Sequence, residues 1–187
     1  MDWLAAQAAR APFTVLGCEL PAQMELEGYA FIGYIDRLDR DDATGAVSVI
    51  DYKTGSIATT AEEYRESVRA FQEFQLPFYY WARTAEGDRV STLSLVPLKD
   101  ALLDVAPISL EVVPVPTAGV GARSTRGVIS IGELEAARAR MIALARELSG
   151  GTLAHFAPTT DPQACRYCAY ANACNLRPAP AEERFAR

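Results

Sequence analysis

The sequence is most informative at Gly33–Asp39 (GYIDRLD) and at Val49–Gly55 (VIDYKTG). Each stretch reads as a β-strand because it carries an apolar run, and each run reaches an acid. In the second stretch, a lysine follows the acid by two residues. Side chains alternate between the two faces of a strand, so Asp51 and Lys53 are expected to point the same way. Acids at strand ends often only face water, and other features must decide their role.

Residues 41–45 (DDATG) form a turn-rich segment between the two stretches. A turn there folds the strand that contains Asp36 back antiparallel to the strand that contains Asp51. Two carboxylates and the ammonium of Lys53 can then converge at one end of a sheet. Hard cations such as Mg²⁺ take oxygen ligands, few of them from protein, and a neighbouring lysine can orient water or stabilise charge on a phosphate. The arrangement indicates metal-assisted phosphodiester hydrolysis.

Three of the four cysteines lie close together near the C-terminus, at Cys165, Cys168 and Cys174. Residues 1–10 do not form a secretory signal, which favours a metal or a cluster over disulfides. Three thiolates suit Zn²⁺ or an iron–sulfur cluster, and both normally need a fourth ligand. His155, the only histidine, could complete a zinc site. The alternatives are that it packs near a turn and that the thiols stay unligated.

Together these features resemble the PD-(D/E)XK nuclease domain of RecB- and AddB-type helicase–nucleases and of their CRISPR-associated relatives. The matching pieces, in the family's order, are GYIDRLD (Gly33–Asp39), IDYKTG (Ile50–Gly55), QLPFY (Gln75–Tyr79) and the C-x2-C-x5-C tail. The resemblance implies an α/β, restriction-endonuclease-like fold, with a mixed central sheet flanked by helices. It gives a nuclease domain over residues 1–176, including the cysteine segment, and a flexible tail over residues 177–187.

The resemblance also implies roles at the predicted metal site. Asp36 and Asp51 would bind Mg²⁺ or Mn²⁺, together with the backbone carbonyl of Tyr52, and Lys53 would assist the nucleophilic water. Glu19 is a further candidate carboxylate ligand. The alternative for Glu19 is an acid at a strand end that is only solvated.

The same resemblance implies that Gln75 and Tyr79 lie on a helix beside the catalytic site. Because they are four residues apart, they are expected to share one face of that helix. The alternative for Tyr79 is ordinary packing in the core, which is also the reading adopted for Trp81.

In the family, a 4Fe–4S cluster ties the C-terminal segment to the nuclease core, which implies that Cys165, Cys168 and Cys174 are ligands. The family's fourth cysteine lies upstream of the core, in a helical region. Here the only upstream candidate is Cys18, in a run that reads as a first core strand. We therefore expect a C-terminal fragment whose fourth ligand lies outside it, with Cys18 as the alternative. Such a fragment could lack both cluster and activity.

The composition fits one globular domain and adds a constraint on partners. A chain of 187 residues that is 50% hydrophobic can bury a sizeable core. No window approaches 18 unbroken apolar residues, so no membrane span is expected, and the location is predicted to be cytoplasmic. The net charge of −6 argues against a DNA-binding surface over the whole domain. We therefore expect a partner helicase–nuclease subunit to provide the grip on DNA.

Periodicity and capping signals predict the secondary structure. Strands are expected near residues 13–20, 22–27, 29–38, 46–53, 91–97 and 108–115. A short helix is expected at the N-terminus, and longer helices are expected near residues 60–71, 72–86 and 130–148. Capping boxes mark two of the helix starts, at Thr60–Glu63 and Ser130–Glu133. Residues 101–106 could add a short strand, and residues 116–127 are expected to form a loop.

The sequence thus predicts a Mg²⁺-dependent deoxyribonuclease, an exonuclease domain of a DNA-repair helicase–nuclease. One alternative is a non-catalytic, nuclease-like module that uses a structural cluster or zinc site and binds DNA or a partner subunit. Another is a zinc-binding interaction module, which would leave the acid–lysine site without a role. The presence of Asp36, Asp51 and Lys53 together favours the nuclease, because a decayed site tends to lose one of them.

Overall fold

The computed structural model describes residues 12–55, 57–98, 107–115, 124–151, 159 and 168–169. The chain forms two compact units, Met1–Ala145 and Arg146–Arg187. The predicted N-terminal helix and the predicted strand at 101–106 lie outside the described residues. Among the helices that are described, none is long and apolar enough to cross a membrane.

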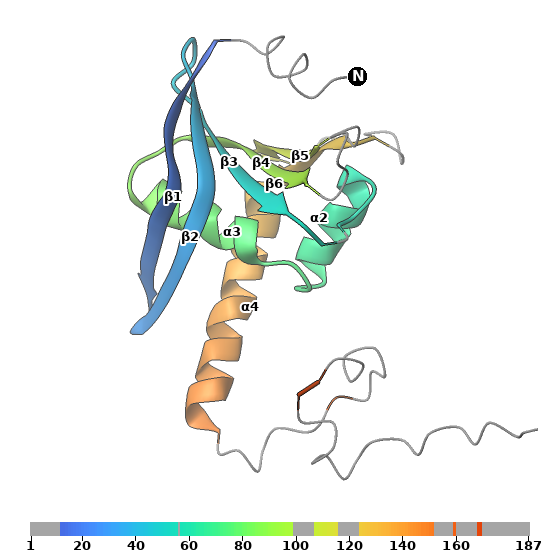
Figure 1. Ribbon diagram of the computed structural model, residues 1–187. Helices are drawn as coiled ribbons and strands as arrows, with labels where there is room; N and C mark the ends of the chain where they lie inside the picture. Colours follow the sequence, from blue (N-terminus) through green and yellow to red (C-terminus); the bar gives the residue numbers. More distant parts are fainter. Residues whose placement is uncertain are drawn as a thin grey trace, which may run out of the picture. The chain divides into compact units, whose positions relative to one another are not determined.

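The first unit is organised around a six-stranded mixed sheet with the order β1-β2-β3-β4-β5-β6 (Figure 1). The elements are β1 (Phe13–Leu26), β2 (Tyr29–Asp41), β3 (Val47–Lys53), α2 (Ala61–Arg69), α3 (Gln75–Ala85), β4 (Val90–Pro97), β5 (Ile108–Val113), β6 (Arg126–Ser130) and α4 (Ile131–Gly150). Strands β1, β2 and β3 are antiparallel, β3 and β4 are parallel, β4 and β5 are antiparallel, and β5 and β6 are parallel. The predicted α/β class with a mixed central sheet is confirmed.

Strand β1 is a single element, so the prediction of two strands over residues 13–20 and 22–27 is wrong. The predicted gap falls on Pro21, which cannot donate a hydrogen bond to a neighbouring strand. In the structure Pro21 pairs with Tyr34 of β2. Because β1 is the first strand in the sheet order, it is an edge strand, where proline is tolerated. The run that contains Cys18 is therefore an edge strand rather than a core strand, and Cys18 is exposed.

Strand β6 replaces the end of the loop predicted over residues 116–127. It begins at Arg126 and pairs in parallel with β5. Five residues are too few for a convincing alternation of side chains, so the pattern did not reveal it. At Gly127 a Cβ atom would lie 2.8 Å from the Cβ of Ala61. Glycine therefore allows α2 to pack closely onto this strand.

The predicted capping box at Ser130–Glu133 is confirmed, and the one at Thr60–Glu63 is confirmed in part. The amide of Glu133 donates to Ser130 Oγ at 3.2 Å, and the amide of Ser130 donates to Glu133 Oε2 at 2.9 Å. The amide of Glu63 likewise donates to Thr60 Oγ1 at 3.1 Å. The carboxylate of Glu63, however, accepts from the amide of Thr59 at 2.7 Å rather than from the cap residue. Both helices thus satisfy exposed amides in their first turns.

Helix α3 begins at Gln75, later than the predicted start at residue 72. The segment before it is a turn, in which Phe71 adopts a left-handed backbone with φ of 58°. Bulky residues rarely adopt this conformation, so the residue pattern did not predict that the helix would be interrupted there.

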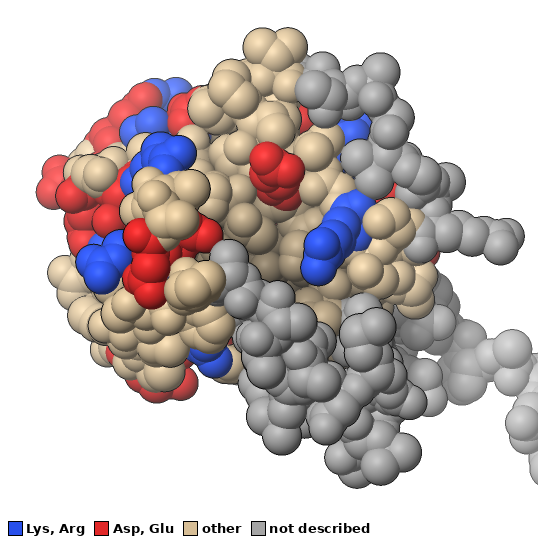
Figure 2. Space-filling view, turned by 90° about the horizontal axis from the view of Figure 1, so that it is seen from above, with Lys and Arg blue, Asp and Glu red and all other residues tan. Residues whose placement is uncertain are grey.

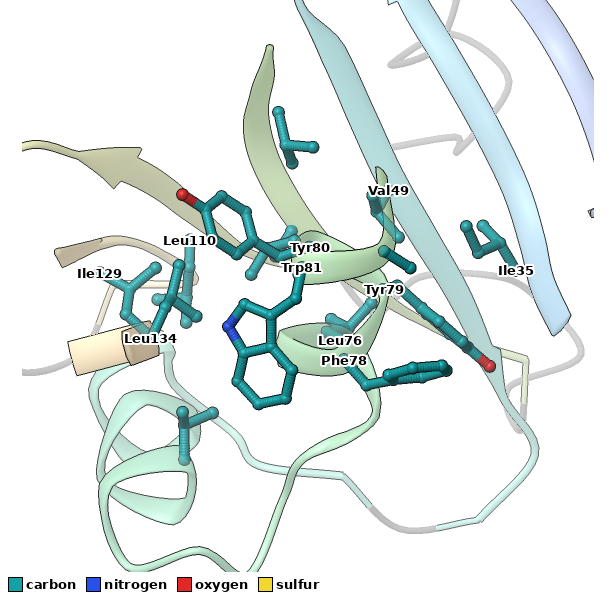
Figure 3. Packing of buried hydrophobic residues seen from close by; sticks show 14 of the residues in the cluster. Ile35, Val49, Leu76, Phe78, Tyr79, Tyr80, Trp81, Leu110, Ile129 and Leu134 are labelled. Carbon is teal, nitrogen blue, oxygen red and sulfur yellow. The ribbon is translucent and has the colours of Figure 1, made fainter. Parts of the chain in front are cut away.

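Helix α3 is buried along most of its length, and it positions the candidate site. The seven residues Leu76–Ala82 are all buried. Figure 3 shows Tyr79 on the side of the helix nearer to Ile35, and Trp81 on the other side with Leu134. Helix α3 packs against β1, β3 and β4, while α2 packs against β5 and β6. The burial of α3 fixes the groups at its first turn relative to the sheet.

Candidate active site

Strand β3 presents Asp51 and Lys53 on one face, as the alternation predicts. Lys53 Nζ lies 2.7 Å from Asp51 Oδ2. Asp51 is 1% exposed, whereas the side chain of Lys53 is 29% exposed. The acid is therefore buried beneath a lysine that still reaches solvent.

Strand β2 brings Asp36 to the same place. Asp36 Oδ2 accepts a hydrogen bond of 2.6 Å from the amide of Tyr52, the residue between the acid and the lysine of β3. The regular pairing of β2 with β3 ends at Arg37 and Ile50. Where the backbone pairing of β2 with β3 ends, the Asp36 side chain thus supplies the hydrogen bond between the strands. This bond places the Asp36 carboxylate near that of Asp51. On its other side, Tyr52 pairs with Val96 of β4.

A series of hydrogen bonds connects β3 through α3 to β2. Lys53 Nζ donates to Gln75 Oε1 at 2.6 Å, and Gln75 Nε2 donates to Tyr79 Oη at 2.9 Å. The hydroxyl of Tyr79 then donates to the backbone carbonyl of Tyr34 at 2.5 Å. The prediction that Gln75 and Tyr79 share one helix face is confirmed. The series gives the Lys53 ammonium a second partner besides Asp51.

Gly33 explains how the helix approaches β2 closely enough for this series. A Cβ atom at this position would lie 2.9 Å from Phe78 Cε1 and 3.0 Å from Tyr79 Cε1. A larger residue would push the ring of Tyr79 away from the Tyr34 carbonyl. The sequence contained Gly33 within the GYIDRLD motif but gave it no role. Its signal was a glycine inside a strand pattern, which often marks close approach by another group.

The electrostatics of the site favour an added positive charge. Burial raises the pKa of Asp51 above its ordinary value of 3.8; the Lys53 ammonium opposes this shift, and the negative charge of Asp36 adds to it. Asp51 Oδ2 accepts no well-directed hydrogen bond from the described residues, so its contact with Lys53 is ionic. A buried carboxylate in this condition gains from a neighbouring cation.

The two carboxylates fit Mg²⁺ or Mn²⁺ as ligands. These ions prefer oxygen and keep several waters, so two protein carboxylates can suffice. Within the described part of the chain, no group of three or more acidic, histidine or cysteine side chains could hold a metal. Glu19 lies on β1 between the residues that pair with Arg37 and Ile35, which places it across from Asp36. It is exposed, with φ of 51°, and it does not complete such a group.

The predicted cluster ligands are only partly described. Cys168 is exposed, as is Cys18 on β1. Cys165, Cys174 and His155 lie outside the described residues. The iron–sulfur cluster and the domain boundary at residue 176 therefore stay predictions.

The family model of the PD-(D/E)XK nuclease superfamily matches residues 1–175. This range contains all five predicted catalytic residues and every strand and helix described above. A sequence comparison with curated proteins found no match. The narrower resemblance to RecB- and AddB-type enzymes stays a prediction. The match covers nearly the whole length, and the chain belongs to the PD-(D/E)XK nuclease superfamily.

Proposed function

We propose that this chain is the metal-dependent exonuclease domain of a cytoplasmic DNA-repair helicase–nuclease. The observation that supports this most is the series Asp51–Lys53–Gln75–Tyr79, which holds one ammonium beside a buried carboxylate, while Asp36 is bonded to the amide of the intervening Tyr52. Membership of the superfamily supports nuclease chemistry. The order and spacing of the four sequence motifs support the repair context.

In this proposal Asp36 and Asp51 hold a Mg²⁺ or Mn²⁺ ion. Such an ion offsets charge on the phosphate and lowers the pKa of a bound water. Lys53 has three N–H donors. In the described part of the chain its ammonium donates a hydrogen bond to Gln75 and lies in ionic contact with Asp51. We infer that its remaining donor capacity serves the attacking water or a phosphate oxygen. Gln75 fixes the ammonium, and Tyr79 fixes the orientation of the Gln75 amide.

The charge distribution supports a partner subunit. The net charge is −6, and Figure 2 shows acidic and basic side chains intermixed toward one side of the face, with a largely uncharged area beyond them. Lysine and arginine contacts with phosphates supply essentially all non-specific DNA affinity. We therefore expect the domain to bind DNA weakly alone and a helicase subunit to deliver the strand.

The proposal includes a 4Fe–4S cluster on Cys165, Cys168 and Cys174. Its fourth ligand is either Cys18 or a residue outside this sequence. Iron and sulfide should be measured after anaerobic purification, with and without Cys18→Ser. A stoichiometric cluster that disappears in Cys18→Ser assigns the fourth ligand to Cys18.

The function is tested with end-labelled linear DNA and covalently closed circular DNA of the same sequence. Mg²⁺ or Mn²⁺ should permit shortening of the linear DNA from an end, EDTA should stop it, and circular DNA should remain intact. Activity with Zn²⁺ alone would contradict the metal assignment. DNA binding without cutting in any metal would favour the non-catalytic alternative.

A further inference from the structure

A cavity of about 300 Å³ opens beside the candidate active site. It lies between β2, the turn that precedes α3, and α3 itself. Gln75 and Tyr79 form part of its wall, so the hydrogen-bonded series that holds Lys53 runs along one side. The volume is at the lower end of the range of roughly 300–1,000 Å³ typical of small-molecule sites. The cavity can therefore accept a compact group of a substrate that is bound at Lys53.

Aromatic rings form much of the remaining wall, contributed by Phe31, Phe74 and Phe78. The rings of Phe31 and Phe78 are tilted against each other, with centroids 6.4 Å apart. Phe74 differs from them because it remains 49% exposed. An aromatic ring that is half exposed at the mouth of a cavity offers a face on which another flat ring can stack.

The exposed ring of Phe74 is held in place by a second aromatic ring. It stacks on Phe71, with centroids 5.6 Å apart and planes 23° apart. The guanidinium of Arg140 on α4 lies over the Phe71 ring, 5.5 Å from its centroid. Phe71 itself has the left-handed backbone described above. Strained residues of this kind concentrate at functional sites, and here the strain supports an aromatic platform rather than a buried core residue.

The polar groups of the wall limit what the cavity can recognise. Gln75 already bonds Lys53 and Tyr79, and the hydroxyl of Tyr79 already bonds the Tyr34 carbonyl. Glu73 is the charged residue of the lining, and its negative charge disfavours a phosphate. A neutral, flat, aromatic group fits this environment best, and it would be held by stacking rather than by directed hydrogen bonds.

We infer that this cavity binds an unpaired nucleobase of the DNA strand that is cut, stacked on Phe74, while the adjoining phosphate lies at Lys53. The identification of the ligand as DNA rests on the proposed function. Stacking is tolerant of sequence because every base has a π-face, so all four bases are accepted. A paired base must first leave its duplex, which costs free energy. The domain therefore prefers single-stranded DNA or frayed ends.

The test uses the full chain and single-stranded oligonucleotides that carry 2-aminopurine, a fluorescent base, at successive positions from each end. Binding is measured in EDTA, where no hydrolysis is expected. Stacking on Phe74 should quench the fluorescence at one position. Phe74→Ala and Phe74→Leu should abolish the quench and weaken binding about 5- to 150-fold, the range for loss of one stacked base. Phe74→Trp should keep both, and Val115→Ala, which removes an exposed apolar side chain outside the cavity lining, should match the wild type.

The two proposals fail in different ways. A quench that is unchanged in Phe74→Ala overturns the base site, as does equally tight binding of an oligonucleotide that lacks the base at that position. These results would leave Mg²⁺-dependent cutting intact. A Phe74-dependent quench without cutting in any metal supports the base site and contradicts nuclease activity of this chain by itself.

Discussion

Two acid–base pairs lie on neighbouring strands, and they differ in how many directed hydrogen bonds the acid accepts from its basic partner. Arg37 pairs with Asp39 on β2, and Lys53 pairs with Asp51 on β3, with two residues of separation in both cases. Both acids are 1% exposed. Arg37 binds Asp39 through two nitrogens, at 2.7 and 3.1 Å. Asp51 Oδ2 has only its ionic contact with Lys53 and no well-directed hydrogen bond from the described residues.

This difference separates a structural pair from a candidate catalytic one. The hydrogen bond to Asp39 raises the pKa of Arg37, so the guanidinium stays charged, and it binds the carboxylate through two directed hydrogen bonds. Burial raises the pKa of Asp51 despite the lysine beside it. A buried acid whose pKa stays raised beside a lysine is a candidate for a functional site. Substitutions in the two pairs should therefore affect different properties, catalysis for the Lys53 pair and stability for the Arg37 pair.

The largest effect is expected for Lys53→Ala. Loss of one preorganised charged group typically lowers a rate by roughly 10²–10³, whereas a partly exposed lysine contributes little to the core. Single-turnover cleavage should fall by that factor with little change in melting temperature. Arg126→Ala, which removes an exposed positive charge from β6, is the control and should cut normally. A wild-type rate for Lys53→Ala would exclude its catalytic role.

Arg37→Ala should lower stability and leave the cleavage rate nearly unchanged. It leaves Asp39 buried without its guanidinium, and breaking such a pair costs about 3 kcal/mol of unfolding free energy. Urea unfolding measures this loss, and the folded variant should still cut DNA within a few-fold of the wild type. The more exposed pair Arg138–Glu135, at 3.3 Å, supplies the control, since Arg138→Ala should lose less than about 1 kcal/mol. Equal losses of unfolding free energy in Arg37→Ala and Arg138→Ala would contradict a structural role for the Arg37–Asp39 pair.

Mg²⁺ should stabilise the fold by binding at Asp51 of the Lys53–Asp51 pair. A ligand at one hundred times its dissociation constant adds about 2.7 kcal/mol, measurable as a rise in melting temperature across a Mg²⁺ titration. Asp51→Asn should lose this response because one carboxylate ligand is gone. A stable Arg37→Lys variant should keep it. If Asp51→Asn responds to Mg²⁺ as the wild type does, the ion does not bind at Asp51.

The smallest effect concerns pH in the absence of metal. The folded pKa of Asp51 lies above its ordinary value of 3.8, so the native state holds this proton more tightly than the unfolded state. Stability should therefore fall as the pH rises from 3.8 through the folded pKa, and then level off. In EDTA, the stability of Asp51→Asn should not fall in this way. Its stability relative to the wild type should therefore increase as the pH rises from 3.8 through the folded pKa of Asp51. A difference that is independent of pH would contradict the raised pKa.

Local sequence signals predicted much of the fold. The alternation in β2 and β3 and the two capping boxes act over a few residues, so their consequences could be predicted without a structure. The placement of Pro21 on an edge strand, the short β6 and the left-handed Phe71 depend on distant partners. The sequence could not show them, because the same residues would behave differently in another tertiary setting.

In the candidate site, too, local sequence predicted some features, and others depend on distant partners. Alternation predicted that Asp51 and Lys53 share a face, and spacing predicted the same for Gln75 and Tyr79. The spacing cannot distinguish Asp51–Lys53 from Arg37–Asp39, because the distinction depends on burial and on which oxygens find donors. The aromatic turn at Phe71 and Phe74 was also hidden, since it involves the left-handed backbone of Phe71 and a contact of that ring with Arg140 of α4.

The parallel pairing of β3 with β4 has a consequence for the order of folding. Strands β1, β2 and β3 follow one another and can pair through short turns, whereas β3 meets β4 only after α2 and α3 have crossed over, more than 40 residues later. Closing such a long loop is slow relative to forming hairpins. We therefore expect the early chain to keep Asp51 in water and to bury it only as the crossover docks. The candidate site is then among the last parts of the chain to form.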